Sequence, residues 1–122
     1  MKNIVKNKIL IMDDDKDELL LIRHLLCAKG YDVLISENGN GIREKNLSGI
    51  DLFLVDINMT GVPGTDVCEY LKKDKTTKDK PVILISASPE LDLKASTCGA
   101  DDYLLKPFSI TNLMRLLQYH LD

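Results

Sequence analysis

Residues 8–28 read KILIMDDDKDELLLIRHLLCA, and this stretch decides the fold class. Its first five residues form an apolar run that is too short for a helix and rich in strand-forming residues. Three aspartates follow, and any of them could begin a helix. Leu19, Ile22 and Leu26 then recur at helical spacing, and Gly30 provides a stop. The stretch therefore predicts a strand joined to a helix through an acidic loop.

The same alternation continues along the rest of the chain. Apolar runs predict further strands at residues 31–36, 51–55, 81–86 and 102–105. Between and after them, helical spacing predicts a short, weak helix at 42–47, helices near 67–71 and between 90 and 98, and a last helix at 110–121 capped by Ser109. Three strands are continuously apolar, as is typical of parallel strands covered on both faces. The sequence thus predicts an α/β fold, a doubly wound parallel sheet of the (βα)5 type in one domain over residues 1–122.

Composition narrows the class of protein. The chain has 122 residues, of which 44% are hydrophobic and 29% charged, as in ordinary globular domains. No apolar run reaches the roughly 18 residues of a membrane span, and polar residues 6–8 interrupt the segment that could serve as a secretory signal. A net charge of −3 gives no strong electrostatic case for nucleic-acid binding. Cys27, Cys68 and Cys98 lack metal-like or redox-like spacing. We therefore expect a soluble cytoplasmic domain with reduced thiols.

Charged and hydroxyl side chains stand at the ends of four predicted strands. Asp13 and Asp14 follow the first strand, Asp56 the third, Ser86 ends the fourth and Lys106 follows the fifth. In doubly wound sheets, ligands bind beyond the carboxyl ends of the strands. Oxygen ligands at such an edge suit Mg²⁺, and three carboxylates, one divalent ion and one lysine sum to zero charge. The pattern predicts a Mg²⁺ site made by the three aspartates.

Such a site also suits phosphoryl transfer. A carboxylate can act as a nucleophile and form an aspartyl phosphate, and the transfer needs positioning and charge neutralisation more than acid–base chemistry. Mg²⁺ and Lys106 would neutralise the phosphoryl oxygens, and Ser86 would donate a hydrogen bond to one of them. Each residue alone has a plainer explanation, as a helix cap, a structural hydroxyl or a turn. Their occurrence at four strand ends favours the functional interpretation.

Taken together, these residues resemble the receiver domain of bacterial two-component response regulators, in the single-domain form of chemotaxis regulators. Four segments carry the resemblance and run in the family's order through essentially the whole chain: KILIMDDDKDELLLIRHLL, DLFLVDINMTGVPGTDVCEYLK, PVILISAS and GADDYLLKPF. The resemblance implies a flavodoxin-like receiver fold. It also implies that Asp56 is the phosphoacceptor, taking a phosphoryl group from the phosphohistidine of a sensor histidine kinase.

The resemblance assigns further roles. Asp13 and Asp14 match the acidic pair that holds Mg²⁺ with Asp56, and the backbone carbonyl of Asn58 completes that site. The remaining matches are the switch hydroxyl, the phosphate-pairing lysine, the aromatic residue that changes rotamer on activation and the proline of a cis peptide bond: Ser86, Lys106, Tyr103 and Pro107.

Two departures from the family pattern stand out. Thr60 lies where relatives commonly have proline, and we expect it to loosen the loop after the third strand. The stretch between Ser86 and Lys106 is shorter than in relatives, so the helix within it should be trimmed. That helix contributes to the family's output face, so partner choice and dimer mode are less transferable than phosphorylation.

The sequence therefore predicts a phosphorylation switch, not a turnover enzyme; the domain would catalyse only its own phosphorylation and dephosphorylation. The expected partners are a sensor histidine kinase or histidine phosphotransfer protein and a downstream protein target. No DNA-binding domain and no membrane segment is expected in this chain, which would be a monomer or weak dimer. Two alternatives are a receiver-like interaction module that needs no phosphorylation and an aspartate-nucleophile phosphatase. The phosphatase would want an acid–base carboxylate where Asn58 stands.

Overall fold

The computed structural model describes residues 6–121 and contains one sheet of five parallel strands. Their order across the sheet is β2-β1-β3-β4-β5. The strands are β1 (Lys8–Met12), β2 (Asp32–Ser36), β3 (Leu52–Asp56), β4 (Val82–Ser86) and β5 (Asp102–Leu105). All five agree with the predicted strands to within one residue at each end, because each is a short apolar run bounded by polar or turn-forming residues.

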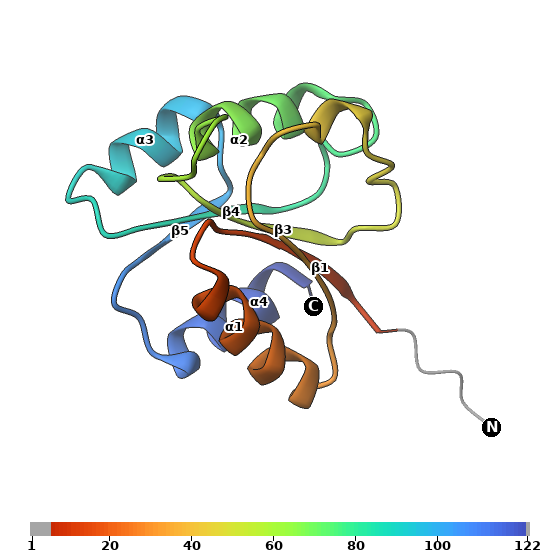
Figure 1. Cartoon of the computed structure of the whole chain (residues 1–122), viewed down its shortest axis with the longest axis vertical. Helices are drawn as coiled ribbons and strands as arrows, with labels where there is room; N and C mark the ends of the chain where they lie inside the picture. Colours follow the sequence, from red (N-terminus) through yellow and green to blue (C-terminus); the bar gives the residue numbers. More distant parts are fainter. Residues whose placement is uncertain (1–5, 122) are drawn as a thin grey trace.

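Helices cover both faces of the sheet, which confirms the doubly wound arrangement (Figure 1). The helices α1 (Lys16–Ala28) and α4 (Ile110–Leu121) lie on one face, and α2 (Gly64–Lys73) and α3 (Leu91–Cys98) lie on the other. Alternate strand residues serve the two layers, so Leu54 packs with α1 and α4 whereas Phe53 packs with α2 and α3. No helix within residues 6–121 has the length and apolar character needed to cross a membrane.

The prediction of a helix at residues 42–47 was wrong. The structure has a single 3₁₀ turn there, over Ile42–Glu44, so within residues 6–121 four α-helices cover the sheet and not five. Gly41 begins the turn in the left-handed conformation, with φ of 72°. Ile42 and Leu47 are nevertheless buried against the α2 face, so the segment covers the sheet without helical structure.

The helix before the fifth strand is short, and whether it is shorter than in relatives stays a prediction. The helix α3 has eight residues and ends at Gly99, whose φ of 83° suits a helix end. Beside this short helix, the outer strand β5 keeps large apolar side chains in solvent: Tyr103 is 44% exposed and Leu105 is 50% exposed. The structure therefore has a partly uncovered sheet edge next to α3 (Figure 1).

Candidate functional site

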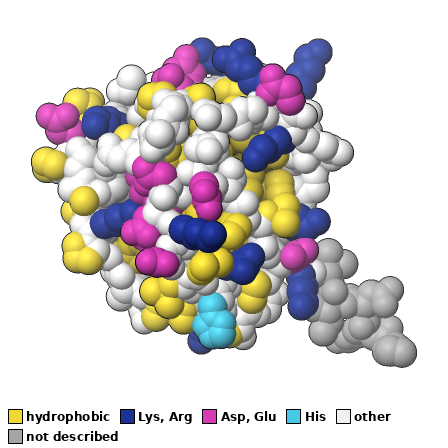
Figure 2. Space-filling view, in the orientation of Figure 1, with side chains coloured by type: hydrophobic (Ala, Val, Ile, Leu, Met, Phe, Trp, Pro, Cys, Tyr) yellow, Lys and Arg dark blue, Asp and Glu magenta, His cyan; other side chains and the backbone are white. Residues whose placement is uncertain are grey.

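The strand order sets the position of the acidic residues. The strands β1 and β3 are neighbours at the centre of the sheet, and their connections leave to opposite faces, so the sheet has its switch point between them. Asp13 follows β1 directly and Asp56 ends β3, so both carboxylates lie at this point. Both side chains are buried, with the residues 2% and 4% exposed. In the space-filling view, carboxylates gather left of centre, between the two helical layers (Figure 2).

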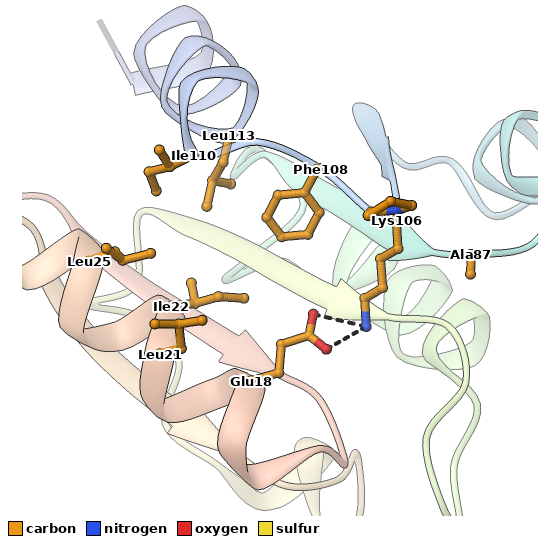
Figure 3. Close-up of a pocket in the computed structure, with 10 residues that line it drawn as sticks. Glu18, Leu21, Ile22, Leu25, Ala87, Lys106, Phe108, Ile110 and Leu113 are labelled. Carbon is orange, nitrogen blue, oxygen red and sulfur yellow. Dashed lines mark hydrogen bonds and ion pairs between the residues drawn. The ribbon is translucent and has the colours of Figure 1, made fainter.

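Lys106 brings the carboxylates together. Its backbone N–H donates to the carbonyl of Ser86, which continues the β4–β5 ladder by one residue. Its Nζ lies 2.7 Å from Asp56 Oδ2 and 3.2 Å from Asp13 Oδ2. It also lies 3.0 Å from the carboxylate of Glu18, which sequence reasoning did not identify (Figure 3). The Lys106–Pro107 peptide bond is cis, as the resemblance implies.

Burial and neighbouring charges shift the protonation of this cluster. Burial raises the pKa of Asp13 to about 6 from its ordinary 3.8, and the negative charge of Asp56 adds to the rise, against the opposing effects of the Asp15 N–H and Lys106. Burial lowers the pKa of Lys106, but hydrogen bonds to Asp56 and Glu18 outweigh it and keep that pKa above its ordinary value. The lysine is therefore a fixed positive charge, and Asp13 is easier to protonate than an ordinary aspartate.

Asn58 links the phosphoacceptor candidate to the hydroxyl at the end of β4. Its backbone N–H donates to Asp56 Oδ1 at 2.8 Å, and its side-chain amide donates to Ser86 Oγ at 3.3 Å. Ser86 is buried and also accepts the backbone N–H of Ser88 at 3.0 Å. Tyr103 lies apart from this group, since its ring is exposed at the edge of the sheet. Strand alternation places Tyr103 and Ser86 on the same sheet face, the α2–α3 face.

The second aspartate of the acidic pair has a different environment. Asp14 is exposed, and its Oδ2 accepts a hydrogen bond of 3.3 Å from the hydroxyl of Thr60. This bond ties the loop after β3 to the acidic pair, a role for Thr60 that the sequence interpretation did not foresee. Asp15 is the N-cap of α1, as is common for an aspartate after a strand, and accepts the backbone N–H of Glu18.

The oxygen atoms at the switch point suit a hard divalent cation. Asp13 and Asp56 already share one cation, the ammonium group of Lys106. Mg²⁺ in proteins takes one or two carboxylates and keeps several waters, so the donor chemistry of this pair fits it. Among the residues that the structure describes, no group of three acidic, histidine or cysteine side chains has the arrangement of a formed metal site. The structure thus brings two of the three predicted metal-binding carboxylates together and leaves Asp14 beside them.

A glycine at the start of α2 positions the end of β3. Gly64 is the first residue of α2, and its N–H donates to the carbonyl of Ile57 at 3.0 Å. A Cβ at Gly64 would overlap the carbonyl oxygen of Asp56 and lie 2.7 Å from the Cα of Ile57. Only glycine lets the helix begin this close to the strand end. No signal in a single sequence reveals such a contact.

Comparison with known proteins shows which family the sequence matches. A family model described as the response regulator receiver domain matches residues 9–118. The nisin biosynthesis regulatory protein NisR of Lactococcus lactis is 34% identical over 110 residues, which are 88% of this chain and 47% of NisR. The transcriptional regulatory protein CpxR of Escherichia coli K12 is 36% identical over 110 residues, again 88% of this chain and 46% of CpxR. The chain thus spans about half the length of these relatives.

A solved structure extends the match to three dimensions. The response regulator protein TrrA from Thermotoga maritima, crystallised in complex with Mg²⁺–BeF, superposes with a TM-score of 0.84 at 32% identity, over 94% of this chain and 99% of TrrA. The fold, the strand-end residues and the family match agree. The chain belongs to the response regulator receiver domain family.

Proposed function

We propose that this domain is a phosphorylation switch and that Asp56 accepts the phosphoryl group, from the phosphohistidine of a sensor histidine kinase or a histidine phosphotransfer protein. One observation carries the assignment to Asp56. Its buried carboxylate has one oxygen held by the Asn58 N–H at 2.8 Å and the other 2.7 Å from the Lys106 ammonium. The carboxylate that would act as nucleophile, Asp56, is therefore already in contact with Lys106, the cation that would neutralise the negative charge of the phosphoryl oxygens.

The chemistry follows from these contacts. A carboxylate oxygen of Asp56 forms a bond to phosphorus, and the bond from phosphorus to the donor breaks, with its electron pair leaving on the histidine nitrogen. Lys106 pairs with the phosphoryl oxygens, whose charge is greatest during transfer. Ser86, at present an acceptor for Asn58 and for the Ser88 N–H, turns its hydroxyl to donate to a phosphoryl oxygen. Asp56 is thus the nucleophile, and the other residues stabilise charge.

The same site supports a magnesium requirement. We infer that Asp13, Asp14 and Asp56 hold Mg²⁺ together with the backbone carbonyl of Asn58. Two observations support this: the shared cation contact of Asp13 and Asp56 and the Mg²⁺–BeF complex of the related protein TrrA. Bound Mg²⁺ supplies charge neutralisation at the phosphoryl oxygens. Millimolar Mg²⁺ should therefore be needed for phosphorylation.

The output of the switch is inferred from the sheet edge. When the Ser86 hydroxyl moves to the phosphoryl group, the space it leaves on the α2–α3 face becomes available to Tyr103, which is now exposed. A phosphorylation event at the switch point then changes the surface made by α3 and β5. We propose that a downstream protein binds this surface, or that the phosphoryl group passes onward in a relay. The domain acts as a switch and turns over only its own phosphoryl group.

Intact-mass analysis after incubation with acetyl phosphate tests the proposal. Wild-type protein should gain one phosphoryl group in the presence of Mg²⁺ and none in its absence. Asp56→Asn should gain none. Asp51→Asn is the matched control, because Asp51 lies just before the same strand, accepts the N–H of Lys8 and is far from Lys106. A Mg²⁺-dependent adduct that persists in Asp56→Asn would contradict the assignment and favour a different acceptor. A folded wild-type protein that takes no phosphoryl group would favour the phosphorylation-independent module.

A further inference from the structure

The carboxylate of Glu18 lies where the first turn of α1 meets the phosphoryl site. Both of its oxygens are 3.0 Å from Lys106 Nζ, a two-pronged contact visible in Figure 3. It lines one end of a cavity of about 450 Å³ between α1 and α4, whose other walls are mostly apolar. Glu18 is thus an acidic residue between an apolar groove and the cluster formed by Asp13 and Asp56.

Local helix capping explains why this carboxylate reaches the lysine. Asp15 caps α1 and Glu18 stands three residues later, where a glutamate commonly turns back to the N–H of the cap residue. Here the N–H of Asp15 already donates to Asp13 Oδ1 at 2.9 Å. The carboxylate of Glu18 has no cap N–H to accept and pairs with Lys106 instead.

The lysine has no spare donor in this arrangement. An ammonium group has three N–H donors, and those of Lys106 bond to Asp13, Glu18 and Asp56. A phosphoryl oxygen can therefore bind Lys106 only when one carboxylate gives up its hydrogen bond. Glu18 is the partner that water can most easily replace, because its side chain is 25% exposed, compared with 2% for Asp13 and 6% for Asp56.

We propose that Glu18 is a positioning residue for phosphoryl transfer: it holds Lys106 in the unphosphorylated site and competes with the phosphoryl oxygens for its ammonium group. The negative charge of Glu18 adds to this competition, because it also repels the incoming phosphoryl oxygens. Asp13, Asp56 and Glu18 carry three negative charges around one lysine, so a phosphoryl group arrives in a site already rich in anions. Removing the charge of Glu18 weakens its hold on one donor of Lys106 and lowers that repulsion. This inference rests on the proposed function.

The test measures binding of beryllofluoride, a stable mimic of a phosphoryl group on a carboxylate, at saturating Mg²⁺ by ¹⁹F NMR. Glu18→Gln keeps the side-chain shape and removes the charge. We expect it to bind beryllofluoride about fivefold more tightly than wild type, the equivalent of about 1 kcal/mol, the usual upper worth of a partly exposed ion pair. Asp17→Asn is the matched control: it removes a neighbouring, exposed carboxylate from the same turn and should leave the affinity within about twofold of wild type.

A double-mutant cycle separates action through the lysine from a general charge effect. In a Lys106→Arg background, whose planar guanidinium cannot reproduce the same contacts, Glu18→Gln should produce a clearly different change in affinity, because coupled residues are not additive. Equal or weaker binding by Glu18→Gln, or an equal gain in Asp17→Asn, would overturn the inference. So would an unchanged effect of Glu18→Gln in the arginine background. Wild-type protein that binds no beryllofluoride would contradict the proposed function itself, which distinguishes the two failures.

Discussion

Replacing Asp13 by asparagine should stabilise the metal-free protein. The carboxylate of Asp13 is buried beside Asp56, and these surroundings raise its pKa to about 6 from 3.8. Above about pH 6 the folded protein must hold this charge at a cost. Asparagine is neutral and of the same shape, and its amide oxygen can still accept the N–H of Asp15. Lys106 keeps Asp56 and Glu18 as partners.

The size of the effect follows from linkage. Because the folded-state pKa lies above the unfolded one, the folded state binds the proton more tightly, and this group's contribution to stability falls as pH rises from about 4 to about 6. A rise of about 2 pKa units corresponds to about 3 kcal/mol in the free energy of unfolding. For a domain of this size that is roughly 10 °C in Tm. The full gain should appear near neutral pH and vanish near pH 4.

Urea and thermal unfolding of wild type and Asp13→Asn, in chelator and over a range of pH, measures this gain. Asp17→Asn serves as the control, since its exposed carboxylate on α1 should leave stability within about 0.5 kcal/mol. An asparagine variant that is no more stable than wild type at neutral pH would show that the buried charge of Asp13 does not destabilise the fold. A gain that is the same at pH 4 would lead to the same conclusion, because the benefit would then come from something other than the charge.

Three further predictions follow from the site. Mg²⁺ at tenfold over its Kd should stabilise the wild-type protein by about 1.4 kcal/mol, or a few degrees in Tm; no shift at millimolar Mg²⁺ would count against the metal site. Gly64→Ala should lower the free energy of unfolding in urea by about 2 kcal/mol or more, because its Cβ meets the backbone of Asp56 and Ile57, and unchanged stability would show that this contact relaxes freely. Phosphorylation should bury the exposed ring of Tyr103, which would shift its NMR ring signals. The Ser86→Ala variant should show no such shift. Ring signals that stay unchanged when the wild-type protein is phosphorylated would contradict a role for Tyr103 in the output surface.

The strands, and the functional residues at their ends, could be predicted from the sequence because parallel strands in a doubly wound sheet are short apolar runs. Each run is followed by a polar residue, and the carboxyl ends of the strands share one edge of the sheet. Asp13, Asp56, Ser86 and Lys106 were identified on that basis, and the structure brings Asp13, Asp56 and Lys106 into direct contact. Ser86 joins them through Asn58.

The second crossover could not be predicted in the same way. Ile42 and Leu47 are apolar and buried, and in sequence they suggest a weak helix. Gly41 takes a left-handed conformation and only a 3₁₀ turn forms. Burial of those side chains against α2 depends on tertiary packing, which overrides the local propensity.

Contacts that depend on side-chain direction were also beyond the sequence. Glu18 reaches Lys106, 88 residues away, while Asp13 accepts the N–H of Asp15. The Thr60 hydroxyl reaches Asp14 from a separate loop. Such pairs become visible only once the chain is folded, since neither has a distinctive spacing along it.

The most direct test of Asp56 as phosphoacceptor is to locate the phosphoryl group on the chain. Wild-type protein phosphorylated with acetyl phosphate and Mg²⁺ is reduced with borohydride, which converts an aspartyl phosphate to homoserine, and is then digested and sequenced by mass spectrometry. We expect homoserine at position 56 and at no other acidic residue, because the buried carboxylate of Asp56 is held both by Lys106 at 2.7 Å and by the Asn58 N–H at 2.8 Å. Homoserine at Asp13, at Asp14 or at a surface carboxylate, with Asp56 unmodified, would contradict this assignment.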